Sequence, residues 1–478
     1  MKIDTQPTEL WQLSAVDLAA GIAGKQFTSR EATESAFTRL DAVNGQLNAV
    51  VEVMRDEALA AADAADAAVT RGETLGLLHG VPCTIKMNVD WQDKPRNNGI
   101  IEMQGTVATK GSSPVTDNML RAGAILLGQT NCPAFASRAH TSNELYGQTL
   151  NPWDPRVTAG GSSGGAAAAV AAGIGAIAHG NDLGGSVRQP AYVCGVVGLK
   201  CTPCMIPNYN PSVALDRPYL HQSTTSQGPL ARSVADAELG FRAMSARDPR
   251  DPWWVPPLPR ELEQPFPCRV ALFFGDGELE PEVRAAMNAA AAMLEDAGCT
   301  VEEAEPPRYA ESWELHKALL QAERMNATLK NIERYGDQAL RNKMKVFENW
   351  RHMTPIETRD EYIAAIAMRS SILREWTAFL DRYPLLITPN IDTQSQPAEM
   401  DQLGLDAVDR DITSRKAHQV ISLLSLPALT VPTGVTNGLP DGVQLVGQRM
   451  QDLFLFRAAA AIEARAGTFT PIDPRGAR

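Results

Sequence analysis

The sequence contains few of the features that mark membrane, secreted or disulfide-stapled proteins. It has no apolar run of about 20 residues, the length that a membrane-spanning helix requires. Its start has no basic segment followed by an apolar core, so no secretory signal is visible and we expect a cytoplasmic protein. The seven cysteines are odd in number and dispersed, which indicates a reducing compartment and no disulfide framework.

Nucleic acid and anionic membranes are also poor candidates as partners. The net charge is −12, and the chain has no long basic run that would form an electrostatic footprint on a polyanion. Hydrophobic residues make up 44% and charged residues 21%, as in ordinary globular proteins. The 478 residues can bury a large core, and we interpret residues 1–478 as a single large domain.

The common metal and phosphate motifs are missing. There is no G-x-x-x-x-G-K-[ST] loop and no H-E-x-x-H helix. Cys201 and Cys204 form a lone C-x-x-C without a second pair at zinc spacing, so structural or pocket-lining thiols are the better interpretation. We therefore predict no metal and no cofactor. None of the seven histidines lies in a recognisable catalytic motif.

Three residues in short, glycine-flanked or strand-like segments supply the parts of an acyl-transfer site without histidine. They are Lys86 in HGVPCTIKMNVD, Ser162 in AGGSSGG and Ser186 in HGNDLGGSVRQPA. Attack on an amide carbonyl needs an oxygen nucleophile, a base and donors for the oxyanion. Ser186 offers the oxygen. Lys86 can serve as the base only if burial disfavours its charge, and its apolar neighbours are consistent with burial.

The residues just before Ser186 favour a backbone oxyanion hole. Asp182, Leu183, Gly184 and Gly185 can turn several N–H groups toward one point, because glycine tolerates positive φ and adds no Cβ.

A rival motif overlaps the same serines. GSSGG satisfies G-x-S-x-G, the nucleophile elbow of α/β-hydrolases, with Ser163 as the nucleophile. That elbow must follow a strand, whereas the preceding NPWDPRVTAG has two prolines and a glycine and is typical of a loop. We therefore disfavour the elbow.

These segments resemble the amidase signature family over most of the chain, from the amphipathic N-terminal region to LSLPALTVPTGVTNGLPDGVQLVG. The spacing between Ser162 and Ser186 matches that family. The resemblance implies that Ser186 is the nucleophile, Ser162 a bridging serine after a cis peptide bond, and Lys86 the general base. It also implies an oxyanion hole made by the backbone N–H groups of Leu183, Gly184, Gly185 and Ser186.

Residues around the triad are open to two interpretations each. The resemblance implies that Asp182 and Arg188 pair or orient the nucleophile turn, although an ordinary buried ion pair is an alternative. Ser163 either joins a hydrogen-bond network or is simply small enough to fit. Met87 stands where the family usually has an aspartate, so a polar partner for the lysine loop is missing. NDLGGS and GLKCTPCMIP also depart from the family pattern.

Hydrophobic periodicity predicts an α/β fold with a central mixed sheet flanked by helices. Thr28 and Glu31 form a possible capping box at one helix start. The predicted helices are 13–23, 29–43, 52–71, 115–122, 166–178 and 281–297, and the predicted strands are 81–89, 124–128, 268–274, 299–305, 385–389, 428–432 and 442–447.

Residues 311–383 show long helical periodicity and predict a helical cap over or beside the sheet. Its aromatic residues either line a substrate entrance or pack in an amphipathic core; they are Trp313, Phe347, Trp350 and Tyr362. Trp253 and Trp254 lie between prolines and are predicted to be in a loop that serves as a lid or an interface contact.

The function that we predict is hydrolysis of an amide through an acyl-enzyme at Ser186, with esters and carbamates as possible substrates and water as the co-substrate. One alternative is a glutaminase subunit of an amidotransferase, because the resembled family includes one. Another is a noncatalytic scaffold, which the intact lysine and serines oppose. A homodimer is possible.

Overall fold

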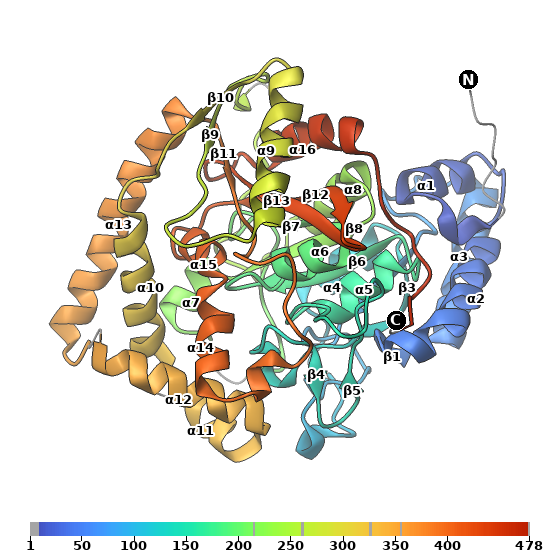
Figure 1. Ribbon diagram of the computed structural model, residues 1–478. Helices are drawn as coiled ribbons and strands as arrows, with labels where there is room; N and C mark the ends of the chain where they lie inside the picture. The colour runs from blue at the N-terminus through green and yellow to red at the C-terminus, as the bar shows by residue number, and fades with distance from the viewer. Residues whose placement is uncertain (1–8, 214–215, 260–261, 325–326, 354–355, 477–478) are drawn as a thin grey trace.

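A mixed sheet of 11 strands passes through the middle of the molecule (Figure 1). The computed structural model describes residues 9–213, 216–259, 262–324, 327–353 and 356–476. The strand order is β1–β3–β2–β6–β8–β7–β12–β13–β11–β9–β10. The strands are β1 (Val50–Val53), β2 (Pro82–Lys86), β3 (Ile125–Thr130), β6 (Ile177–Asp182), β7 (Val197–Lys200), β8 (Ser226–Ala231), β9 (Arg269–Leu272), β10 (Thr300–Glu303), β11 (Leu385–Thr388), β12 (Ala428–Thr436) and β13 (Leu439–Val446). A separate hairpin pairs β4 (Ser142–Asn143) with β5 (Gly147–Gln148).

Helices cover both faces of the sheet, and each helical layer buries its own apolar core against the strands. One layer consists of α1 (Ala15–Ala23), α4 (Pro114–Arg121), α8 (Val234–Met244), α9 (Pro281–Asp296) and α16 (Asp452–Ala466). The other consists of α2 (Ser29–Leu47), α3 (Arg55–Arg71), α5 (Gly164–Ala171) and α6 (Arg188–Cys194). Short 3₁₀ turns occur at Leu10–Gln12, Ile101–Met103, Ala134–Ala136 and Met400–Gln402.

A third apolar cluster holds a helical cap at one end of the sheet, at the left and lower left of Figure 1. The cap contains α10 (Tyr309–Arg324), α11 (Ala327–Tyr335), α12 (Gln338–Met353) and α13 (Arg359–Arg382). It packs with α7 (Tyr219–Thr224), α14 (Leu405–Thr413) and α15 (Lys416–Leu423). The predicted helical cap over residues 311–383 is therefore confirmed.

The arrangement of two neighbouring strands places the lysine beside the second serine segment. β2 is parallel to β6, with Cys83 opposite Ile177 and Thr84 opposite Ala178. The C-terminal ends of parallel strands meet at one edge of a sheet. Lys86 ends β2 and Asp182 ends β6, so the turn that carries Ser186 begins next to the lysine.

Most predicted elements are present, and the α/β fold class is confirmed. The capping box at Thr28 and Glu31 forms as expected. Several predicted elements differ from the structure at their ends, and two of these differences change how a segment is assigned. The helix predicted over 52–71 begins at Arg55, because residues 52–53 pair with β3 as part of β1. The predicted helix over 166–178 ends at Ala171, and β6 begins at Ile177.

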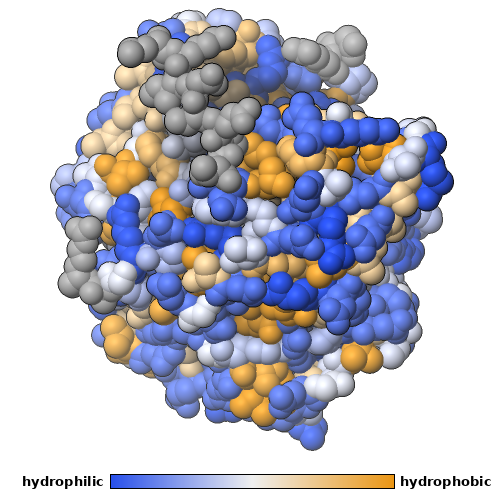
Figure 2. All heavy atoms as spheres, turned by 90° about the vertical axis from the view of Figure 1, so that its right-hand side faces the viewer, coloured by the Kyte–Doolittle hydropathy of each residue, from blue (hydrophilic) through white to orange (hydrophobic). Residues whose placement is uncertain are grey.

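The surface on the side of α1–α3 is mostly hydrophilic, with apolar side chains in small scattered groups (Figure 2). None of the helices in the described part of the chain combines the length and the apolar character that a membrane crossing needs. Trp253 lies in a loop, as predicted, and is 62% exposed.

Candidate active site

The amine of Lys86 lies at the centre of a buried polar cluster. The side chain has no exposed surface, and Nζ donates hydrogen bonds to Ser162 Oγ at 2.7 Å and to Ser163 Oγ at 2.9 Å. A third hydrogen bond reaches Asn181 Oδ1 at 2.9 Å. A protonated amine has three donors and uses all of them here, whereas the neutral amine gives up one and gains a lone pair.

The environment of Lys86 makes its neutral form accessible. Burial lowers the pKa of Lys86 to about 8, because transfer of an ammonium out of water is unfavourable. The Cys132 thiol and the Asp182 carboxylate favour the charged form, while Arg217 disfavours it. The sequence required that burial disfavour the charge of Lys86 if it is to act as a base, and the structure meets this requirement.

Asn181 holds the lysine amine together with Asn88. Its Oδ1 accepts from Lys86 and also from Asn88 Nδ2 at 3.1 Å, while its own Nδ2 donates to Asn88 Oδ1 at 2.9 Å. This reciprocal pair fixes the amide with its oxygen toward the amine. Sequence reasoning missed Asn181 as a site residue. The signals were its place just before Asp182 and the absence of a polar group at position 87, where Met87 is buried.

The Gly–Ser loop also contacts the lysine amine, through Ser162 and Ser163. Ser162 is 1% exposed and follows a cis peptide bond from Gly161. The Ser163 N–H donates to the carbonyl oxygen of Ser186 at 3.2 Å, which ties this loop to the turn that carries the proposed nucleophile. All three members of the predicted triad therefore belong to segments in direct contact.

The structure decides against the nucleophile elbow. Residues 157 and 158 form only isolated bridges, so no strand leads into Ser163. Ser163 Oγ instead accepts from Lys86 and donates to the Asn181 carbonyl at 3.5 Å. Ser163 is therefore part of a hydrogen-bond network around the Lys86 amine.

Asp182 shapes the turn before Ser186. Its Oδ1 accepts from Gly185 N at 2.8 Å, and its Oδ2 accepts from Val187 N at 3.1 Å. The carboxylate thus holds the backbone on both sides of the serine. Ser186 itself is partly exposed and lines a cavity.

Arg188 completes this arrangement with a bidentate ion pair. Its Nε and Nη2 each lie 2.9 Å from a carboxylate oxygen of Asp182. Arg188 also donates to Gln444 Oε1 at 2.6 Å and to Ser422 Oγ at 2.9 Å. Burial alone would raise the pKa of Asp182, but the Arg188 guanidinium and the backbone donors hold it well below its usual range. Asp182 and Arg188 therefore form an ion pair with each other, and Asp182 also orients the turn.

Three backbone N–H groups remain open for an oxyanion. Among the described residues, those of Leu183, Gly184 and Ser186 have no hydrogen-bond partner. The N–H of Gly185 donates to Asp182, which corrects the expected set of four donors. Gly185 is needed for another reason: its φ is +114°, and an added Cβ would lie 2.5 Å from Nδ1 of the buried His418.

A cavity of about 70 Å³ opens onto Ser186 and Gly184. Leu320, Phe347 and Ile412 provide apolar walls, and the cap therefore contributes directly to the site. Cationic side chains also line it; they are Arg138, Lys343 and Arg415. Arg138 is neutralised by Asp401 at 2.7 Å and by Glu399 at 2.8 Å, and Arg415 by Asp411 at 2.9 Å.

The cap aromatics divide between the two roles that the sequence left open. Phe347 lines the cavity. Trp350 packs behind it with ring centroids 5.2 Å apart, and Trp313 stacks edge-on against Trp350 at 5.4 Å. Tyr362 donates instead to Glu323 at 2.7 Å. Only one of the four therefore contacts the cavity, and two others form its supporting layer.

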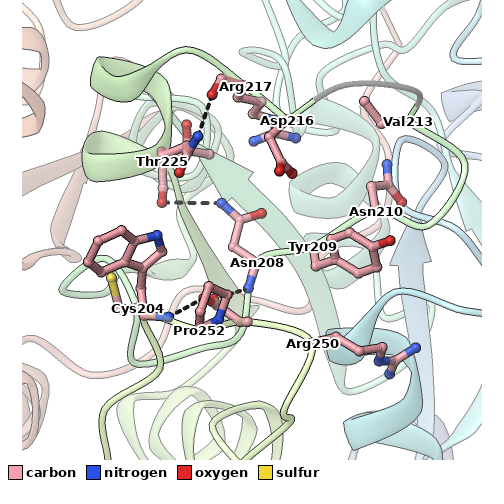
Figure 3. Close-up of a pocket in the computed structure, with 13 residues that line it drawn as sticks. Cys204, Asn208, Tyr209, Asn210, Val213, Asp216, Arg217, Thr225, Arg250 and Pro252 are labelled. Carbon is pink, nitrogen blue, oxygen red and sulfur yellow. Dashed lines mark hydrogen bonds between the residues drawn. The ribbon is translucent and has the colours of Figure 1, made fainter.

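A second cavity, of about 180 Å³, has Asn208, Asn210 and Arg217 among the residues that line it (Figure 3). Asn210 lines it and donates to the Asn88 carbonyl at 3.1 Å, which connects it to the amide pair beside Lys86. Cys204 lines this cavity, whereas Cys201 is buried and donates to the Gln227 carbonyl at 3.2 Å. The two thiols thus have the pocket-lining and structural roles that the sequence predicted.

Comparisons with known proteins agree with this geometry. The Amidase family profile matches residues 31–456. The chain is 41% identical to an indoleacetamide hydrolase of Bradyrhizobium diazoefficiens, over 96% of this chain and 87% of the relative. It is 32% identical to an acylamidase of Rhodococcus erythropolis, over 95% of each chain.

Two further matches extend the range of relatives. The chain is 33% identical to a glutamyl-tRNA(Gln) amidotransferase subunit of Moorella thermoacetica, over 95% of this chain and 97% of the relative. The solved structure of 6-aminohexanoate cyclic dimer hydrolase superposes with a TM-score of 0.82 at 26% identity, over 98% of this chain and 99% of that one.

Proposed function

The chain belongs to the amidase signature family and is an amide-hydrolysing enzyme of it, and on this premise we propose that Ser186 forms an acyl-enzyme with Ser162 and Lys86 as its proton relay. The observation that carries this proposal is the contact of a buried amine, with a pKa of about 8, with Ser162 Oγ at 2.7 Å. A neutral amine at that distance can accept the hydroxyl proton.

In the acylation step, neutral Lys86 takes the proton of Ser162 while Ser162 takes the proton of Ser186. Ser186 Oγ then attacks the amide carbonyl, and the oxyanion is bound by the N–H groups of Leu183, Gly184 and Ser186. The proton returns through Ser162 to the leaving nitrogen, and the C–N bond breaks. Water repeats the sequence on the ester and releases the carboxylic acid.

We propose a small primary amide with an apolar or aromatic acyl group as the substrate. The walls made by Leu320, Phe347 and Ile412 support it, as does the similarity to indoleacetamide hydrolase. The cavity of about 70 Å³ suits a short acyl chain. A ring requires more space, because a cavity of about 150 Å³ holds benzene. A shift of the Lys343 side chain, which lies on α12 together with Phe347, would create that space and leave the Phe347 ring as a wall.

The decisive test is intact-mass detection of the acyl adduct. The protein is mixed with indole-3-acetamide, phenylacetamide, butyramide and matched esters and carbamates, then quenched in acid. We expect an adduct on Ser186, no adduct in Ser186→Ala, and faster turnover of primary amides than of carbamates. An adduct that persists in Ser186→Ala contradicts the nucleophile assignment.

A glutaminase is the second candidate, favoured by the similarity to the amidotransferase protein of Moorella thermoacetica over nearly the whole of both chains. Ammonia release from glutamine, measured with the same protein, separates the two. Turnover of glutamine faster than of phenylacetamide supports the glutaminase. The reverse order supports the stand-alone amidase.

A further inference from the structure

A third cavity, of about 220 Å³, lies away from Ser186 and shares no lining residue with the cavity there. Its walls come from α7, from α13 and from the loops that follow β7, α8, α15 and β13. It adjoins the cavity of Figure 3, since Cys204 and Trp253 line both. The catalytic mechanism uses none of these residues.

Arg369 brings a buried positive charge to this cavity. Its side chain is 7% exposed, and its donors reach the Leu423 carbonyl and Ser425 Oγ. No carboxylate of the described residues lies within ion-pair distance of it. This differs from Arg138 and Arg188, whose guanidinium groups are both paired with acids. Burial lowers the pKa of Arg369, while Tyr219 and the Glu323 carboxylate, which lies beyond ion-pair distance, act in the opposite direction.

Arg449 supplies a second cation at the mouth of the cavity. It is exposed, and across the described ranges it has no acidic partner either. Its charge lowers the pKa of Arg369 further, so the two groups act on each other. Two guanidinium groups without acids around one hollow attract an anion, and their planar donors match the two oxygens of a carboxylate.

Aromatic side chains form the rest of the rim. Trp253 is 62% exposed and Tyr219 is 50% exposed, which is unusual for such large side chains. Both line the cavity. Exposed aromatic faces beside cations are typical of sites for flat, partly apolar ligands.

We propose that this cavity is a second binding site, separate from the catalytic one, for a small aromatic carboxylate. The carboxylate lies between Arg369 and Arg449, and the ring lies against Trp253 and Tyr219. The volume is sufficient, because a cavity of about 150 Å³ already holds benzene. The bound anion provides the counter-charge that Arg369 lacks.

Calorimetric titration of the full-length protein with phenylacetate tests this site. 2-Phenylethanol serves as the uncharged analogue, and acetate and inorganic phosphate serve as anions without a ring. We expect phenylacetate to bind most tightly of the four. Arg449→Gln should weaken it about tenfold or more, since hydrogen bonds to charged groups contribute about 1.5–3 kcal/mol. Trp253→Ala should weaken the binding of phenylacetate but not the binding of acetate.

Arg359→Gln is the matched control, because this arginine is also exposed and begins α13 but pairs with Asp360 outside the cavity. It should leave binding unchanged, and Arg449→Gln should leave amide turnover unchanged. Unaltered phenylacetate binding in both Arg449→Gln and Trp253→Ala would place the ligand in the catalytic cavity and overturn the proposal. If 2-phenylethanol bound as tightly as phenylacetate, or phosphate bound more tightly, the ligand would not be an aromatic carboxylate.

Discussion

Asn181 Oδ1 lies 2.9 Å from Lys86 Nζ and is held there by its reciprocal amide pair with Asn88. An acceptor directed at a lysine amine stabilises the ammonium and therefore raises its pKa, against the effect of burial. If Lys86 is the base, as proposed, we therefore expect changes at Asn181 to move the pH at which its amine becomes neutral.

The first prediction concerns the effect of Asn181 on the pKa of Lys86. Asn181→Leu removes the acceptor and should move the acidic limb of the kcat/KM profile to lower pH. Asn181→Asp adds a negative charge and should move it to higher pH. Asn88→Leu frees the Asn181 amide and should produce a smaller downward shift. Steady-state rates between pH 6 and 10 measure all three. Identical limbs in the two Asn181 variants would show that Asn181 does not act on the lysine.

The second prediction concerns the unmodified enzyme. Lys86 is protonated below its pKa of about 8 and then has no lone pair to accept the Ser162 proton. The kcat/KM for a primary amide should therefore rise as pH increases through 8 and level off above it. Lys86→Met should lower the rate by about 10²–10⁴-fold, the usual contribution of general base catalysis. A profile that falls with rising pH would contradict a lysine base.

The third prediction concerns the buried ion pair. Asp182→Asn leaves Arg188 buried without its counter-charge and should cost about 3–5 kcal/mol of unfolding free energy in urea. The exposed pair of Arg359 and Asp360 is the control, and Asp360→Asn should cost under about 1 kcal/mol. Because the pKa of Asp182 is depressed in the folded state, its contribution is complete above the usual aspartate pKa of about 3.9 and is lost as pH falls below it. Equal losses of unfolding free energy in Asp182→Asn and Asp360→Asn would contradict the role of Asp182 as the buried counter-charge of Arg188.

The fourth prediction compares neighbouring glycines. Gly185→Ala combines a φ of +114° with a Cβ placed 2.5 Å from His418, so it should lower both the melting temperature and the rate. At Gly184 the nearest atom to an added Cβ is Gln419 Cγ at 3.6 Å, an ordinary contact. Gly184→Ala should therefore keep the melting temperature, although it lines the cavity. Differential scanning calorimetry of Gly185→Ala and Gly184→Ala measures the two melting temperatures.

The fifth prediction tests the cap as a specificity wall. Phe347→Ala should raise KM for phenylacetamide more than for butyramide, because only the aromatic acyl group loses a ring contact. Tyr362→Phe is the control on the same cap, since its hydroxyl contacts Glu323 outside the cavity. It should leave the ratio of the two KM values unchanged. If Phe347→Ala raised KM equally for phenylacetamide and butyramide, Phe347 would not determine the preference for an aromatic acyl group.

Local sequence was sufficient where one segment carries the signal. The capping box of Thr28 and Glu31 depends on residues three apart, and it formed as predicted. The strand carrying Lys86 was also predicted, since short apolar runs between turn residues favour strands. The ends of elements were less certain, because pairing of residues 52–53 with a strand far along the chain shortened a predicted helix.

Site residues that act through distant contacts were not visible in the sequence. Asn181 matters because β6 lies beside β2, and nothing in its own segment shows that neighbour. The division of the cap aromatics depends on how α10 and α12 pack, which brings Trp313 against Trp350 while leaving Phe347 at the cavity.

The candidates for the reacting groups could be named from the order of residues, because Lys86, Ser162 and Ser186 lie in short segments that resemble the amidase signature family. What the fold alone decided is their charge state and surroundings. A pKa depends on burial and on charges that reach the group through space. Asp182, one of the charges that act on Lys86, comes beside it only when the parallel strands β2 and β6 pair.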